Sequence, residues 1–308
     1  ENWYKMNFFK AQQHKYRALK SVFDQLGAGD ELLIQFPIIH HTFFISQLIK
    51  QAQNRGVKFY LVIHDIETLR HVGNSAVKLR HKVRNYFQEK AALTSVDGII
   101  VHNDIMKNAL TIQGIPSDKM VSLEIFDYLI PNFEEKNVPQ KEEAIIIAGN
   151  LIPTKSGYLY NLPEQPAYNL YGMGYDESRA LKNTTYFGSF MPDDLPNALQ
   201  GSFGLVWDGD SSETCQGSFG NYLRINNSHK ASLYLASGFP LVVWKESALA
   251  HFVLDKQCGI AIDSLHDLQK ALDDLTDRDY MKLSANARQV GVALRNGDYL
   301  KSAISRLK

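Results

Sequence analysis

Residues 228–244 read SHKASLYLASGFPLVVW, a stretch with the pattern of a helix followed by a strand. Ser228 is suited to cap the helix, small residues end it before Gly238, and the apolar run after Pro240 is typical of a buried strand. A helix N-terminus offers free amides and a positive dipole to an anion, whereas Lys230 in the first turn opposes that dipole. The stretch therefore predicts an α/β unit that binds a diphosphate; the alternative is an ordinary capped helix with an exposed lysine.

The same alternation of apolar runs and helical spacing extends over most of the chain. Strands rich in Val, Ile and Leu that alternate with helices predict parallel sheets covered on both faces, so the expected fold class is α/β. The expected strands are 31–36, 58–63, 98–101, 120–125, 144–148, 168–171, 185–187, 203–207 and 240–244, and the expected helices are 8–26, 42–54, 77–93, 104–113, 228–237, 265–275 and 280–292.

A polar stretch, PNFEEKNVPQKE at 131–142, interrupts this alternation. Since 308 residues exceed the usual size of one hydrophobic core, we expect two domains, 1–142 and 143–292. The first domain opens on a helix without the strand that usually begins such a fold. Either its sheet is short or upstream residues supply the strand, and we favour the second interpretation.

Composition and charge restrict the partners. The chain is 44% hydrophobic and 21% charged, which is ordinary for a globular protein. Its 33 Lys and Arg residues balance 33 Asp and Glu residues, so no net field attracts a nucleic acid. Cys215 and Cys258 have no zinc or redox spacing and are expected to be free thiols in a reducing compartment.

The sequence contains no apolar run of the ~20 residues that cross a bilayer, and residues 1–5 do not have the layout of a signal peptide. We therefore expect a cytoplasmic protein, whose contact with a membrane would be peripheral.

Polar residues follow several of the expected strands, where ligands bind in open parallel sheets. Gly149 and Asn150 form a phosphate-compatible turn, and Lys155 follows at a distance that could return to the same site. The alternative is one of the many glycine turns that end strands. His102 and Asn103 are weaker candidates of the same kind.

His64 and Asp65 end the strand at 58–63, with Glu67 and Arg70 beyond them. A hydroxyl nucleophile needs a general base, for which Asp65 is the first candidate and His64 the second. The alternative is a capping aspartate and a histidine with a structural role.

Asp208-Gly209-Asp210 has the D-x-D spacing that can hold a divalent metal, but Asp-Gly is a turn signal, and we expect a structural turn. The histidines have no metal-ligand spacing, and the sequence has no GxSxG elbow, Walker lysine or G-x-G-x-x-G turn. Hydrolase, ATPase and dehydrogenase functions are therefore unsupported.

Five segments resemble GT-B glycosyltransferases, in particular the bacterial group that contains the streptococcal glucosyltransferase acting on GlcNAc-modified serine-rich adhesins and the β-1,6-galactofuranosyltransferases. The similarity covers nearly the whole chain in motif order and spacing. The segments are IHDIETL (63–69), AGNLIPTK (148–155), FGLVW (203–207), SHKASLYLASGFPLVV (228–243) and VALRNGDYLKSAI (292–304).

The resemblance implies two Rossmann-like domains facing a cleft, with a C-terminal helix at 293–308 that crosses back to the first domain. It implies a UDP-sugar donor in the C-terminal domain and a glycan, glycopeptide or lipid-linked acceptor facing the N-terminal one. It also implies that no metal or other cofactor is needed and that the protein is a homo-oligomer. A glucosyl or galactofuranosyl unit would be transferred.

Carried onto this sequence, the resemblance assigns the diphosphate to Lys230 with neighbouring amides. The nucleotide sugar would contact Gly149, Asn150 and Lys155, and Asn226, Asn227, Ser228 and His229 would line the same pocket. Large retaining families carry two glutamates around this helix, where this chain has Asn226 and Leu233, so the stereochemical outcome is not inferred. The alternatives are a non-catalytic GT-B-like module that binds a glycan or partner, and a nucleotide-sugar epimerase.

Overall fold

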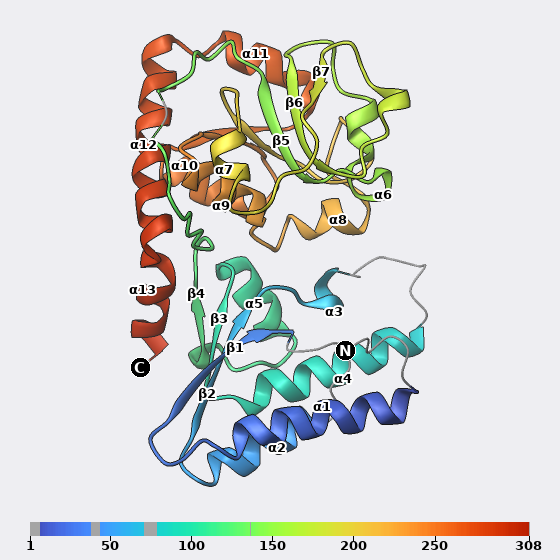
Figure 1. The fold of residues 1–308 in the computed structure, drawn as a ribbon, viewed down its shortest axis with the longest axis vertical. Coiled ribbons are helices and arrows are strands. Elements are labelled where there is room, and N and C mark those ends of the chain that lie inside the picture. Colours follow the sequence, from blue (N-terminus) through green and yellow to red (C-terminus); the bar gives the residue numbers. More distant parts are fainter. Residues whose placement is uncertain (1–6, 38–43, 71–78, 136, 308) are drawn as a thin grey trace. The chain divides into compact units, whose positions relative to one another are not determined.

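The computed structural model describes residues 7–37, 44–70, 79–135 and 137–307. The chain forms two compact units: the N-terminal unit comprises Glu1–Ser122 and Ala303–Lys308, and the C-terminal unit comprises Leu123–Ser302 (Figure 1). The sequence places these divisions at 142/143 and 292/293. In the structure the units divide after Ser122 and after Ser302. The chain after Ser122 already packs in the C-terminal unit: Ile125 joins its core, and the Tyr128 amide donates to the Leu294 carbonyl at 3.2 Å.

The N-terminal unit contains a parallel four-stranded sheet in the order β1-β2-β3-β4. Helix α2 contacts both α1 and α4 (Figure 1), and α5 contacts β3 and β4. The elements are α1 (Phe8–Phe23), β1 (Glu31–Phe36), α2 (Ile45–Gln53), β2 (Lys58–Ile63), α3 (Glu67–Arg70), α4 (Leu79–Ser95), β3 (Gly98–Val101), α5 (Asp104–Ile112), η2 (Ser117–Lys119) and β4 (Met120–Ser122).

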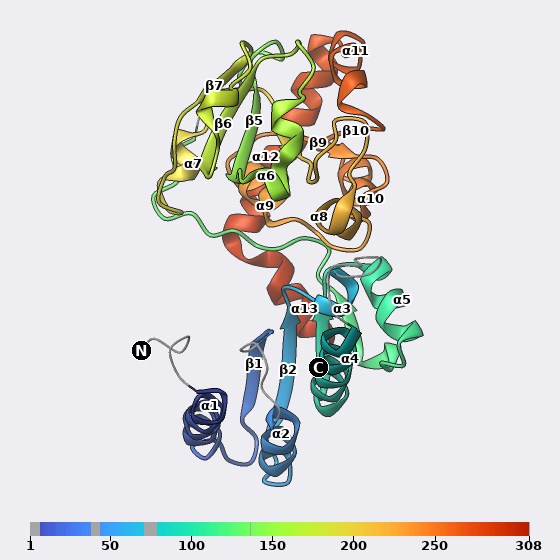
Figure 2. The same ribbon diagram turned by 90° about the vertical axis from the view of Figure 1, so that its right-hand side faces the viewer.

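The C-terminal unit contains a parallel six-stranded sheet in the order β10-β9-β8-β5-β6-β7. Strands β5, β6 and β7 lie side by side in it (Figure 2). Its elements are β5 (Ile145–Asn150), α6 (Pro153–Ser156), η3 (Gly157–Tyr160), β6 (Tyr168–Met173), η4 (Glu177–Arg179), β7 (Thr184–Tyr186), α7 (Leu195–Ala198), β8 (Gly204–Val206), α8 (Gly217–Tyr222), α9 (His229–Ala236), β9 (Leu241–Trp244), α10 (Ala248–Asp255), β10 (Gly259–Ile262), η5 (Leu265–Asp267), α11 (Leu268–Asp273) and α12 (Asp277–Asn296), and α13 (Asp298–Leu307) follows.

The α/β fold with parallel sheets is confirmed, and several short elements were not anticipated, among them α10 and β10. Helix α10 reads ALAHFVLD, which is apolar almost throughout and so lacks a helical stripe, and β10 is only a four-residue strand, GIAI. No helix in the described part of the chain is long and apolar enough to cross a membrane.

Tyr234 joins α9 to the middle of the C-terminal sheet. Strands β5 and β8 pair at a single register position, Ile146 with Gly204. Beyond that position, the fully buried Tyr234 hydroxyl accepts a hydrogen bond from the Ala148 amide at 2.6 Å. A Cβ on Gly204 would lie 2.1 Å from Cγ of the tyrosine, so only glycine lets the ring pack here. This contact sets the position of α9 against the strand ends.

We expect Tyr234→Phe to lower the free energy of unfolding by about 1–3 kcal/mol, because it leaves the Ala148 amide buried without an acceptor. Urea denaturation measures the loss. Tyr168→Phe is the matched control, since that hydroxyl is buried and has no hydrogen-bond partner among the described residues. An equal loss in both variants would contradict the role given to the Tyr234 hydroxyl.

Candidate functional site

The carboxyl ends of β5 and β8 lie beside the N-terminus of α9. Gly149, near the end of β5, has a φ of +131°, and a Cβ there would lie 3.7 Å from Cδ of Lys230. The carbon chain of the lysine therefore passes beside Gly149. Ser228 caps α9, as expected, by accepting a long 3.4 Å hydrogen bond from the Lys230 amide. The structure thus brings together Gly149, Ser228 and Lys230.

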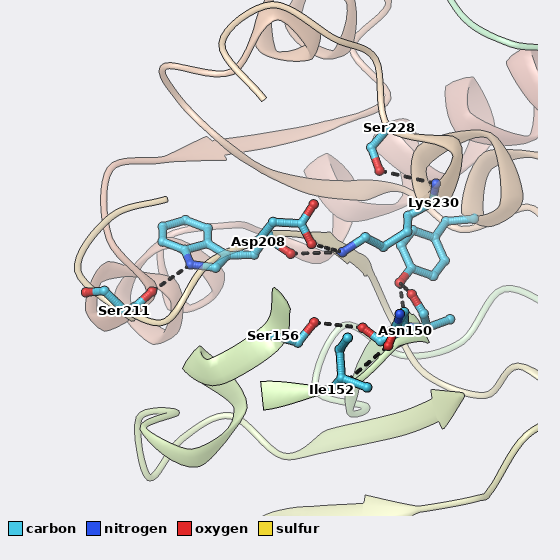
Figure 3. Close-up of polar contacts among 10 residues, drawn as sticks. Asn150, Ile152, Ser156, Asp208, Ser211, Ser228 and Lys230 are labelled. Carbon is cyan, nitrogen blue, oxygen red and sulfur yellow. Dashed lines mark hydrogen bonds and ion pairs between the residues drawn. The ribbon is translucent and has the colours of Figure 1, made fainter. Parts of the chain in front are cut away.

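Lys230 has an anionic partner within the protein. Its Nζ donates to the Trp207 carbonyl at 2.9 Å and to Oδ1 of Asp208 at 2.8 Å (Figure 3). The two charged side chains are only 13% and 8% exposed. A buried charge is tolerated when it is paired and hydrogen-bonded. The alternative of an exposed lysine is therefore wrong. The sequence analysis assigned Asp208 only to a structural turn and did not anticipate its pairing with Lys230.

The two carboxylates of the D-x-D segment have separate partners. Asp208 pairs with Lys230, whereas Asp210 is exposed and its Oδ1 accepts from Nε2 of Gln216 at 3.1 Å. Gly209 between them has a φ of +115°, which supplies the expected turn. Among the described residues, no group of three or more His, Cys, Asp or Glu side chains is placed to hold a metal ion.

The loop after β5 is tied to the D-x-D turn. Asn150 folds the loop, because its Oδ1 accepts from the Ile152 amide at 3.1 Å and its carbonyl accepts from the Ser156 hydroxyl at 2.9 Å (Figure 3). The Lys155 carbonyl accepts from the Gly209 amide at 2.8 Å. The Lys155 ammonium lies 5.5 Å from the centroid of the Phe219 ring. Asn150 and Lys155 therefore lie in a segment that is hydrogen-bonded to the turn carrying Asp208, the partner of Lys230.

Two side chains before and at the start of α9 contact the first residues of the C-terminal unit. Asn227 is buried, and its amide donates to the carbonyl of Glu124, a residue with a φ of +73°. The ring of His229 stacks on Phe126 with centroids 4.1 Å apart. These contacts fix the loop before α9, which the sequence could not anticipate because the partners lie about a hundred positions away.

Asn226, in the same loop, has a different environment. Its Oδ1 is buried and has no hydrogen-bond partner in the described part of the chain.

His64 and Asp65 belong to the N-terminal unit, directly after β2. The Asp65 carboxylate forms an ion pair with the Arg70 guanidinium, which also contacts Glu67 at 3.1 Å. Burial lowers the pKa of His64, although the neighbouring Asp65 charge opposes the shift. Burial therefore favours the neutral imidazole, which is the form that can accept a proton.

The weaker candidates His102 and Asn103 lie between β3 and α5. His102 is buried, and Asn103 caps α5 by accepting from the Met106 amide at 2.8 Å.

Comparison with known proteins identifies the family. The N-terminal domain model of the glucosyltransferase 3-like family matches residues 2–125, and its C-terminal domain model matches residues 145–307. The β-1,6-galactofuranosyltransferase WbbI of Escherichia coli K12 is 34% identical over 284 residues, which cover 90% of this chain and 79% of the relative. Glucosyltransferase 3 of Streptococcus gordonii is 23% identical and covers 96% of this chain and 84% of its own length.

The fold is also shared with solved structures. Sucrose-phosphate synthase from Thermosynechococcus elongatus aligns with a TM-score of 0.65 at 15% identity, over 98% of this chain and 78% of that one. This likeness confirms the GT-B fold. Because the two domain models match most of the sequence and a relative is 34% identical over 90% of it, the chain belongs to the glucosyltransferase 3-like family of glycosyltransferases.

Proposed function

We propose that this protein transfers a hexosyl unit, glucose or galactofuranose, from a UDP-sugar to a sugar hydroxyl of a glycan, glycoprotein or lipid-linked acceptor. The family relatives named for galactofuranosyl and glucosyl transfer support the reaction class. The observation that carries the donor site is the position of Lys230, which lies in the first turn of α9 and whose side-chain carbons pass beside Gly149, near the end of β5. A cation and free amides at the end of a parallel sheet suit a diphosphate.

In this proposal Lys230 and the first amides of α9 bind the diphosphate. As the bond between the anomeric carbon and the β-phosphate oxygen breaks, negative charge grows on the departing UDP, and the ammonium stabilises it electrostatically. Gly149 lets the phosphates approach the backbone because it has no side chain. Asn150 and Lys155 would contact the sugar or the nucleotide from the neighbouring loop.

The acceptor hydroxyl needs a base, which we assign to His64 or Asp65. The Asp65 carboxylate is already bound by Arg70, whereas burial lowers the pKa of His64 and so favours its neutral form. These observations favour His64, reversing the order that the sequence suggests. The base takes the hydroxyl proton while the acceptor oxygen forms the new glycosidic bond.

Thermal unfolding in the presence of UDP tests the donor site. A ligand that binds only the native state raises the melting temperature, by the equivalent of about 2.7 kcal/mol at a hundred times its Kd. We expect UDP to raise the melting temperature in EDTA, with little further change when Mg²⁺ or Mn²⁺ is added in excess. A rise that requires metal would instead make Asp208 and Asp210 metal ligands. No rise under either condition would contradict a UDP site and favour the non-catalytic binding module.

A further inference from the structure

The geometry around the Lys230 ammonium leaves one direction open. An ammonium has three N–H donors. Two of them are directed to the Trp207 carbonyl and to Oδ1 of Asp208. Within the part of the chain that the structure describes, no acceptor from the protein takes the third N–H. The ammonium can therefore donate one more hydrogen bond.

Neutral groups surround this ion pair. Burial is the main cause that raises the pKa of the Cys215 thiol and of the Tyr158 and Tyr234 hydroxyls. The negative charge of Asp208 raises all three further, and the charges of Lys230 and Arg224 oppose the shift at Cys215. The Arg224 side chain itself pairs with Glu246. Among the described residues, Asp208 is therefore the carboxylate that pairs directly with the ammonium.

We propose that Asp208 is the internal counter-ion of Lys230. The Asp208 carboxylate holds the ammonium against the end of β8 and competes for it with the diphosphate of a nucleotide. Asp208 would be a positioning residue that acts through Lys230 and needs no contact with the donor. This inference rests on the proposed function in one respect, namely that the diphosphate binds at Lys230.

The competition follows from charge. A phosphate oxygen that accepts the third N–H would lie close to the carboxylate that accepts another, and two anions at such a separation repel each other in a poorly solvated site. The carboxylate therefore makes the site bind a diphosphate less tightly than the lysine alone would. A weaker hold on the diphosphate also favours release of UDP after transfer.

Asp208→Asn isolates this charge, because it keeps the shape and the carbonyl acceptor of the side chain. We expect calorimetric titration in EDTA to show UDP binding about tenfold more tightly to Asp208→Asn than to the unmodified protein. Uridine, which has no phosphate, should bind both equally. The gain should disappear in Asp208→Asn/Lys230→Met. Damage to the fold cannot produce a phosphate-dependent gain in affinity.

Unchanged or weaker UDP binding by Asp208→Asn would overturn the proposal. The melting temperature without ligand checks the fold, and Asp208→Ser serves the same test if the asparagine variant does not fold. Lys230→Met alone separates this inference from the proposed function. If it binds UDP like the unmodified protein, the donor site itself is wrong. If it loses UDP affinity while neither Asp208 variant gains any, only the counter-ion role is wrong.

Discussion

Lys230→Ala should lower kcat/KM for the UDP-sugar by about a hundredfold or more, the size of effect expected when one preorganised donor to a developing negative charge is removed. Both the binding of the diphosphate and the stabilisation of the departing UDP lose the ammonium. Steady-state kinetics with a UDP-hexose and titration with UDP measure the two losses. Undiminished turnover would contradict the role of Lys230.

The same substitution should also reduce stability, because it leaves Asp208 buried without its partner. Removing one member of a buried ion pair typically costs about 3–5 kcal/mol. The sequence gives no sign of this cost, since a lysine in the first turn of a helix looks replaceable.

A double variant separates the two effects. Lys230→Met/Asp208→Asn removes both charges, so it should regain much of the free energy of unfolding that Lys230→Met loses, while its activity stays low. Activity that returned together with stability would mean that Lys230 acts only through the fold.

Gly172→Ala should lower the free energy of unfolding by about 3 kcal/mol, since it adds overpacking to an unfavourable backbone conformation. Gly172 has a φ of +143°, and a Cβ there would lie 1.8 Å from the carbonyl oxygen of Gly149 on the paired strand. Neither strand can shift without breaking the β5–β6 pairing. Because Gly149 lies beside Lys230, UDP affinity should fall as well.

Gly188→Ala is the matched control for that substitution. Gly188 also has a positive φ, +81°, but an added Cβ would meet nothing within 4 Å. It should therefore show only the backbone cost, about 1 kcal/mol. Urea denaturation of the two variants compares them directly. A loss in Gly172→Ala no larger than in Gly188→Ala would contradict the close approach of β5 and β6.

The approach of Gly172 to Gly149 illustrates the limit of the sequence. A glycine in a strand signals a turn, a bulge or a close contact without distinguishing them. The domain boundary after Ser122 is a second example of this limit. In the sequence, the alternation of strands and helices is interrupted only by the polar stretch at 131–142, which therefore suggests a later boundary. Residues 123–130 look like a continuing strand and linker, and only their packing assigns them to the second unit.

Local spacing, capping chemistry and motif order are enough to predict the parallel α/β architecture, the cap at Ser228 and the family. They do not predict which groups meet at the ends of the strands, because that depends on how the elements pack. Asp208 and Lys230 are 22 positions apart, and their pairing depends on how β8 and α9 pack across the sheet. Local patterns carry no information on such a pairing, because burial and the loss of water create the need for a counter-ion only once the chain has folded.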